Sequence, residues 1–356
     1  MGCITSTQRV DVTPKSPSWK DEVGKETVLA AITRLDQDIA NSEKFCPAQR
    51  LMTVSAELES IQQEVKEFEE TTRPLNSTDS YPKSMHQMFV SLDLYRRPIL
   101  ATENEDFVAN VNRKEMRKIE LMWLRTREKQ LQCEKRVLHA QLLRIRSLYT
   151  QLQQLLDCIW SDGRRPGMQL EDALERVHAL RNALASVSSR LRAAAEYAQS
   201  ALKLLDSALP TWKLASIGKS GWERTSACAD ACKLFVHARC QERSARRVLA
   251  ASAAPRAARA LRLALDYAFT DTMHDYKYQR ATETFLNFKE ALIQLVQSIH
   301  QVLLNTLENL AVAEQELTES RSQLRATRIN VIVKQGLADL RYDSAALDSL
   351  RNKIKC

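Results

Sequence analysis

The chain has 356 residues, of which 44% are hydrophobic and 27% charged, with only 7 Gly and 9 Pro. Leu, Ala, Gln, Glu and Arg are abundant, and no Asn-Gly or Asp-Gly hairpin turn lies between alternating segments, so the composition indicates long helices. No stretch of eighteen or more uncharged apolar residues could cross a bilayer, and the net charge of +8 favours anionic partners such as a membrane surface.

The first six residues carry an acylation pattern. Removal of Met1 would expose Gly2, Ser6 stands where N-myristoylation requires Ser or Thr, and Cys3 is available for palmitate. One myristoyl chain gives only marginal membrane binding, so Cys3 would supply the second signal. These residues resemble the doubly acylated N-termini of Src-type kinases and G-protein α subunits, and this resemblance implies lipid attachment but no fold or activity. We therefore expect lipid on Gly2 and Cys3.

This anchor would place the protein on the cytoplasmic face of a membrane, and we expect the plasma membrane. No charged-then-apolar signal peptide leads the chain, which agrees with a cytosolic topology. The eight cysteines should then be mostly reduced. Residues 1–20 are polar, with two proline-containing pairs, and are predicted to be a disordered, acylated N-terminal tail.

Residues 21–71 are predicted to form N-terminal helices. The second of them carries apolar residues at three- and four-residue spacing, which is the period of one helix face: Val54, Leu58, Ile61, Val65 and Phe68. Residues 72–110 contain three prolines and lack sustained periodicity, so they are predicted to be a Pro-containing linker, with a short helix near 84–95 as an option. Whether residues 21–71 join the following helices stays open at this stage.

Residues 111–356 are predicted to form a long-helix bundle, because apolar residues recur there at a strict seven-residue step. In residues 115–160 the column is Leu124, Leu131, Leu138, Ile145, Leu152 and Ile159. Residues 169–208 carry two columns: Leu170, Val177, Leu184, Leu191, Ala198 and Leu205, and Ala173, Leu180, Val187, Ala194, Ala201 and Ala208. A third stretch carries Val296, Leu303, Leu310, Leu317, Leu324 and Val331.

The breaks between these stretches predict how the helices connect. A loop is expected from Pro210 to about residue 222, then a helix over 223–252 and a last long helix over 257–334, bent near 270–275. Short connections favour antiparallel neighbours within one chain. The predicted fold class is therefore all-α, an elongated antiparallel helical bundle or coiled coil.

The leucine column Leu303, Leu310, Leu317 and Leu324 matches a leucine zipper in spacing. A DNA-binding zipper needs a basic helical segment directly upstream. In residues 280–302 the only basic residues are Arg280 and Lys289. We therefore expect these leucines to serve helix packing, and we expect no nucleic-acid partner. A homodimer seam along this column stays open, as do protein partners that bind the helices.

Charge is distributed unevenly. Residues 219–262 hold 10 Lys/Arg against 3 acids, whereas residues 36–70 hold 3 against 9 and residues 281–320 hold 1 against 6. Seven arginines in the basic stretch are candidates for membrane contact: Arg239, Arg243, Arg246, Arg247, Arg256, Arg259 and Arg262. The alternative is internal pairing with the acids of 36–70 or 281–320, and the sequence does not decide between the two.

No catalytic or metal motif is convincing. Cys228, Cys232, His237 and Cys240 approach a zinc spacing, but one helix cannot direct all four side chains at a single ion. We expect no cofactor and no enzymatic activity. The favoured function is a non-enzymatic, acylated helical scaffold or adaptor. The alternatives are a membrane-shaping module that resembles BAR domains in architecture only, with basic helix faces, and a soluble coiled-coil structural protein.

Overall fold

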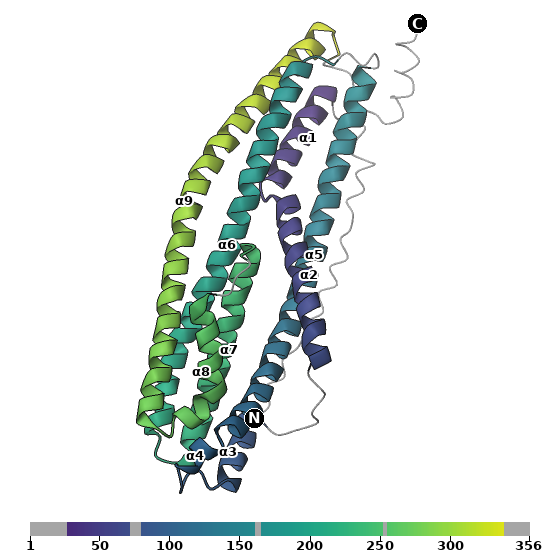
Figure 1. Ribbon diagram of the computed structural model, residues 1–356. Helices are drawn as coiled ribbons and strands as arrows, with labels where there is room; N and C mark the ends of the chain where they lie inside the picture. The colour runs from purple at the N-terminus through teal and green to yellow at the C-terminus, as the bar shows by residue number, and fades with distance from the viewer. Residues whose placement is uncertain (1–26, 72–79, 161–164, 252–254, 338–356) are drawn as a thin grey trace, which may run out of the picture. The chain divides into compact units, whose positions relative to one another are not determined.

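The computed structural model describes residues 27–71, 80–160, 165–251 and 255–337. Most of these residues are helical, and there is no strand among them (Figure 1). The helices are α1 (Val28–Glu43), α2 (Pro47–Thr71), α3 (Tyr81–Ser91), α4 (Leu100–Glu103), α5 (Glu105–Ile159), α6 (Met168–Ile217), α7 (Gly221–Val248), α8 (Arg256–Asp271) and α9 (Asp275–Lys334). The predicted all-α helical bundle is confirmed. The predicted tail, with Gly2 and Cys3, lies outside the described residues.

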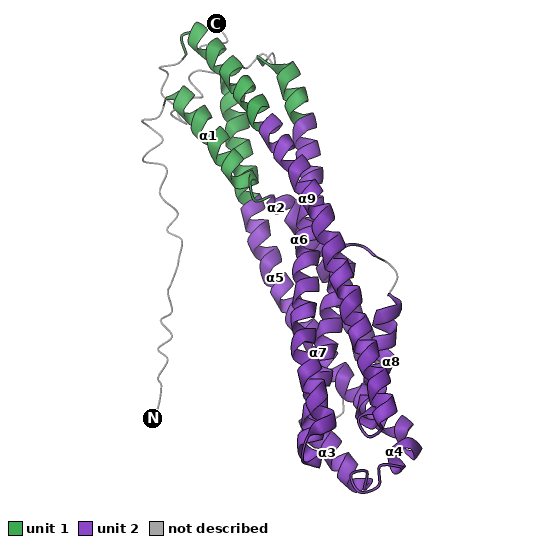
Figure 2. Ribbon diagram, turned by 90° about the vertical axis from the view of Figure 1, so that its left-hand side faces the viewer, with its two compact units in different colours: residues 1–45, 143–175, 318–356 green, residues 46–142, 176–317 purple. Residues whose placement is uncertain are grey.

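The chain forms two compact units (Figure 2). Unit 1 contains residues 1–45, 143–175 and 318–356, and unit 2 contains residues 46–142 and 176–317. Helices α5, α6 and α9 each contribute one stretch to unit 1 and another to unit 2. The units therefore differ from the predicted segments, which were continuous in sequence. Each unit instead combines stretches that are distant in the chain, because a helical core forms wherever stretches pack together.

Unit 1 packs α1 against the last turns of α5 and α9. Thr27 caps α1 by accepting a hydrogen bond from the Ala30 N–H at 3.3 Å, and the apolar face of the helix then enters the core. The buried residues are Val28, Ala31, Ile32, Leu35, Leu155, Leu156, Trp160 and Ile332. Arginines of α9 surround this core with ion pairs to carboxylates: Arg321 to Glu43, Arg325 to Asp36 and Arg328 to Glu171.

Unit 2 contains the largest core, to which α3, α5, α6, α7, α8 and α9 contribute. Its centre is aromatic: the ring of Phe285 lies 4.2 Å from Phe235 and 5.1 Å from Trp212, centroid to centroid. Helix α2 packs on α5 through an apolar cluster of Val54, Leu58, Ile61, Val65, Leu124, Leu131 and Leu138. From α5 to α9, successive helices in this unit run in opposite directions (Figure 1).

The predicted linker over 72–110 is largely helical where it is described. Tyr81, Met85 and Phe89 of α3 are buried in the unit 2 core, and α5 already begins at Glu105. Pro82 does not prevent the helix, because it stands in the first turn, where its missing N–H would have no partner in any case. Of the predicted N-terminal helices, α1 joins the core of unit 1 and α2 joins a core of unit 2.

The loop predicted at Pro210 is wrong, because α6 continues through this proline to Ile217. Trp212 accounts for the difference: its side chain is 1% exposed, it stacks on Tyr278 at 5.1 Å, and its Nε1–H donates to the Thr282 hydroxyl at 2.8 Å. Burial of an aromatic side chain of this size outweighs the lost backbone hydrogen bond of a proline within a helix. At the other predicted break, near 270–275, the chain does interrupt the helix, between α8 and α9.

The heptad columns describe α5 better than the first half of α6. Leu124, Leu131 and Leu138 are at most 1% exposed. In α6, Leu180 is 52% and Val187 is 45% exposed, whereas Arg181 and Ser188 are buried. The buried stripe is thus displaced by one residue there, because the Arg181 guanidinium reaches Glu314 on α9, with 3.6 Å between Nη2 and Oε1.

Candidate functional site

The basic stretch predicted for membrane contact lies mainly on α7. Ser220 caps this helix, because its hydroxyl accepts the Glu223 N–H at 3.1 Å, and the Glu223 carboxylate in turn accepts the Lys219 N–H at 2.9 Å. This reciprocal arrangement satisfies donors that a helix start otherwise leaves free. The helix then presents arginines at three- and four-residue spacing on one side: Arg239, Arg243, Arg246 and Arg247.

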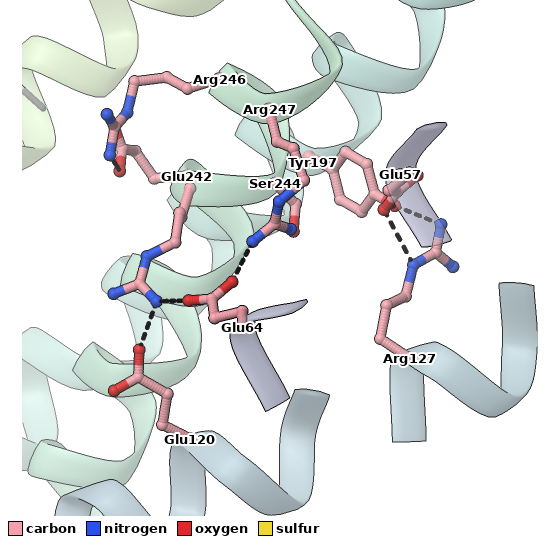
Figure 3. A network of polar contacts seen from close by, with 10 residues as sticks. Glu57, Glu64, Glu120, Arg127, Tyr197, Glu242, Ser244, Arg246 and Arg247 are labelled. Carbon is pink, nitrogen blue, oxygen red and sulfur yellow. Dashed lines mark hydrogen bonds and ion pairs between the residues drawn. The ribbon is translucent and has the colours of Figure 1, made fainter. Parts of the chain in front are cut away.

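Two carboxylates, Glu120 of α5 and Glu64 of α2, bind three of these arginines. Arg239 Nη2 lies 2.8 Å from one oxygen of Glu120, and Arg243 Nη1 lies 2.8 Å from the other. Arg243 also pairs with Glu64, whose second oxygen pairs with Arg247 (Figure 3). The chain of charges therefore ties α2, α5 and α7 together inside unit 2.

Arg246 pairs with a carboxylate of its own helix. Its Nε lies 2.5 Å and its Nη2 3.1 Å from the two oxygens of Glu242, which is only 2% exposed. All four α7 arginines are thus engaged inside unit 2, with side chains between 10% and 30% exposed. These contacts favour the alternative of internal pairing for the four residues, and membrane contact by them stays a prediction.

The remaining three candidates, Arg256, Arg259 and Arg262, are exposed on α8. They recur every three residues, so they lie near one another along the helix surface. In the part of the chain that the structure describes, no helix is long and apolar enough to span a membrane.

A second polar cluster joins α2, α5 and α6. The Tyr197 hydroxyl donates to Glu57 and accepts from Arg127, and Arg127 Nε lies 3.4 Å from Glu57. The Arg127 guanidinium also covers the Tyr197 ring, 5.2 Å from its centroid. Burial, followed by the nearby Glu57 carboxylate, raises the pKa of Tyr197, so the phenol remains protonated and can donate.

Burial alone would lower the pKa of Arg243, but Glu120 and Glu64 outweigh it and raise that pKa. The arginine is therefore charged, and its charge is compensated. The same surroundings, burial first and Glu120 second, raise the pKa of the Cys240 thiol to about 12. A thiol held protonated in this way is a poor nucleophile and a poor metal ligand.

The cysteines considered for zinc are core residues. Cys228 and Cys232 are buried on α7, and burial followed by their mutual contact raises the pKa of Cys228. His237 shares the helix, where burial and then Lys233 lower its pKa. Among the described residues, no group of three or more His, Cys, Asp or Glu side chains could hold a metal ion.

The four zipper leucines lie on the packing face of α9, to different depths. Leu317 and Leu324 are 6% and 5% exposed, whereas Leu303 and Leu310 are half-buried. Leu303 contacts a cluster that includes Leu191, Val248 and Ile299. These leucines thus contribute to helix packing within one chain.

The carboxylates that organise the site were not predicted from the sequence. Glu57 and Glu64 are seven residues apart and flank the apolar column of α2, which is a signal of burial that could have been recognised. Glu120 gives no such signal, because it lies in a stretch rich in Lys and Arg.

Comparison with known proteins finds no matching family model, no similar curated protein and no similar solved structure.

Proposed function

We propose that the protein is a non-enzymatic helical scaffold that is acylated at Gly2 and Cys3 and held on the cytoplasmic face of a membrane. The observation that carries this proposal is the N-terminal pattern, with Gly2 after Met1, Cys3 beside it and Ser6 at the hydroxyl position. Two acyl chains are the number needed for stable anchoring.

The exposed arginines of α8 support membrane contact. Arg256, Arg259 and Arg262 each add on the order of 1 kcal/mol of attraction to an anionic leaflet when they lie near it. The four arginines of α7 contribute little to such a surface, because carboxylates within unit 2 compensate them. Because these arginines pair with carboxylates of the chain, less positive charge is available for a membrane. This weakens the BAR-like alternative, which needs a broad basic face.

Protein partners would bind the outer faces of the long helices. Leu180 and Val187 of α6 are about half exposed and seven residues apart, so they share one side of the helix. An apolar pair of this kind suits contact with another helix, either of a different protein or of a second copy of this chain.

The test is membrane fractionation of the full chain in cells, together with labelling by myristate and palmitate analogues. Gly2→Ala should abolish both labels and release the protein to the soluble fraction, whereas Cys3→Ser should retain myristate but bind membranes only weakly. Thr7→Ala keeps Gly2, Cys3 and Ser6 and is the matched control. An unlabelled wild type in the soluble fraction would overturn the proposal in favour of a soluble coiled-coil protein.

A further inference from the structure

A cavity of about 240 Å³ lies in unit 2, between residues of α2, α5, α7 and α8. Its lining contains five arginines, Arg113, Arg117, Arg239, Arg243 and Arg262, and we call it the arginine pocket. Only three carboxylates, those of Glu67, Glu120 and Asp266, share this lining. The pocket is therefore positively charged.

Most of the carboxylate charge is already used by three of the arginines. Asp266 binds Arg113 through two nitrogens, at 3.0 Å from Nε and 2.9 Å from Nη2. Glu120 binds both Arg239 and Arg243, as described above. The third carboxylate, Glu67, is exposed and accepts a hydrogen bond from Gln63 at 2.9 Å.

Arg117 and Arg262 are the two arginines of the pocket for which the described part of the chain supplies no partner. Neither makes an ion pair or a hydrogen bond through its side chain among the described residues, although Arg117 on α5 is half-buried. Arg262 is exposed on α8. A third donor is also unused, since the buried Nε of Arg239 has no hydrogen-bond partner.

Unpaired guanidinium groups in a partly enclosed site repel one another, and the repulsion grows as water is excluded. An anion bound between Arg117 and Arg262 would remove this repulsion and supply acceptors for their N–H groups. A group with two negative charges matches the two uncompensated arginines in charge. Phosphate fits best, because the planar guanidinium fork pairs with two phosphate oxygens at once.

We infer that the arginine pocket binds a phosphomonoester group, with Arg117 and Arg262 as its contacting residues. The cavity is smaller than the roughly 300–1,000 Å³ of sites for drug-sized ligands, so it suits a compact phosphorylated headgroup. That group could belong to a phosphorylated inositol lipid or to a soluble inositol phosphate, which present the same chemistry. The inference does not depend on acylation of Gly2 or Cys3.

The experiment uses the full chain produced in bacteria, where it carries no acyl group. Calorimetric titration with inositol trisphosphate tests the soluble source. Flotation with phosphatidylcholine vesicles, with and without phosphatidylinositol bisphosphate, tests the lipid source. Both measurements are repeated with Arg117→Gln and Arg262→Gln. Arg259→Gln is the matched control, because Arg259 is an exposed arginine of α8, like Arg262, but does not line the pocket.

Arg117→Gln and Arg262→Gln should each weaken binding at least about tenfold, because each removes charged hydrogen bonds to the ligand. Arg259→Gln should change the affinity for inositol trisphosphate less than about twofold, as expected for an exposed charge outside the site, and it should weaken vesicle binding less than Arg262→Gln does. Thermal unfolding should be unchanged in all three variants, since none loses an ion pair, and this shows that they fold.

Titration by inositol trisphosphate identifies a site open to soluble ligands, whereas binding to the inositol-lipid vesicles alone identifies a lipid headgroup site. Either result supports the inference if it disappears in the pocket variants. Absence of binding in both arms would overturn it. Binding that Arg259→Gln weakens as much as Arg262→Gln would also overturn it, since the effect would then be general charge attraction.

Discussion

Arg239 and Glu120 form a buried ion pair that joins α7 to α5, with 2.8 Å between Nη2 and Oε2 and side chains 10% and 3% exposed. Glu120 also binds Arg243, so a single carboxylate compensates two guanidinium groups. Burial of a charge is costly unless a partner is in place, and the partner here comes from a helix more than a hundred residues away in the chain.

Removal of this carboxylate should therefore be strongly destabilising. Glu120→Gln leaves Arg239 without its partner and should lower the free energy of unfolding by about 3–5 kcal/mol in urea denaturation. Glu134→Gln is the control, because it breaks the exposed pair with Arg50 and should cost less than about 1 kcal/mol. Equal stability of the two variants would show that the Glu120 network does not hold the helices together.

The hydroxyl of Tyr197 should matter for stability through its hydrogen bonds to Glu57 and Arg127. Tyr197→Phe keeps the ring and removes only the hydroxyl, and it should cost about 1–3 kcal/mol because both partners are partly buried. Tyr276→Phe is matched in chemistry at a side chain that is 75% exposed, so its unfolding curve should coincide with that of the wild type. A Tyr197→Phe unfolding curve that also coincides with that of the wild type would show that the hydroxyl does not contribute to stability.

Periodicity predicted the fold class and one face of several helices. Leu124, Leu131 and Leu138 are buried as their seven-residue step indicated, because a heptad reports which side of a helix meets its neighbours. The acidic stretch 36–70 also supplies Glu64 to the α7 arginines, as internal pairing required. The local sequence pattern was sufficient to predict these contacts, because each depends on which residues share one face of a helix.

Pairwise contacts between distant helices could not be predicted. Glu120 stands among basic residues, so its sequence context gives no sign that it binds Arg239 and Arg243. Arg181 interrupts the expected face of α6 because a carboxylate on α9 lies within reach, and nothing near Arg181 in the chain reveals that. The arginine pocket is likewise a product of four helices, each of which shows only separate charges.

Pro210 should be a destabilising residue that Trp212 compensates. Pro210→Ala restores a helix N–H and should raise the free energy of unfolding by about 1 kcal/mol or more. Pro98→Ala, in a turn, should have the opposite sign and cost about 0.4–1 kcal/mol, because it only frees the unfolded chain. Destabilisation by Pro210→Ala would show that α6 needs the proline.

Trp212→Ala tests the other half of that relationship. Loss of a fully buried tryptophan, with its stacking on Tyr278, should cost about 3–5 kcal/mol. Trp222→Ala is the matched control at a side chain that is 46% exposed, and it should cost clearly less. Similar losses for the two tryptophans would mean that Trp212 is not what carries α6 through the proline.

Two leucines in predicted heptad columns should respond differently to truncation. Leu317→Ala removes a side chain that is 6% exposed and should cost about 2–5 kcal/mol. Leu180 is 52% exposed, so Leu180→Ala should cost under about 1 kcal/mol in the monomer. If Leu180→Ala is instead as costly as Leu317→Ala, and the loss grows with protein concentration, Leu180 is buried against a second copy.

Asp271, at the end of α8, should make stability depend on pH. Burial, and after it the Glu105 carboxylate, raises its pKa to about 7, against the opposing effect of Lys277 and Arg280. The folded chain then keeps a proton that the unfolded chain releases near pH 4. The contribution of Asp271 to stability is therefore complete below about pH 4 and is lost as the pH rises through about 7.

Asp271→Asn removes this dependence, because an amide does not titrate. The wild type should lose stability relative to Asp271→Asn between about pH 4 and pH 7, measured as the difference between their melting temperatures at each pH. Asp275→Asn is the control, since this carboxylate is exposed four residues away, and it should follow the wild-type profile. A difference between wild type and Asp271→Asn that stays constant with pH would mean that Asp271 is ionised throughout, with Lys277 and Arg280 outweighing its burial.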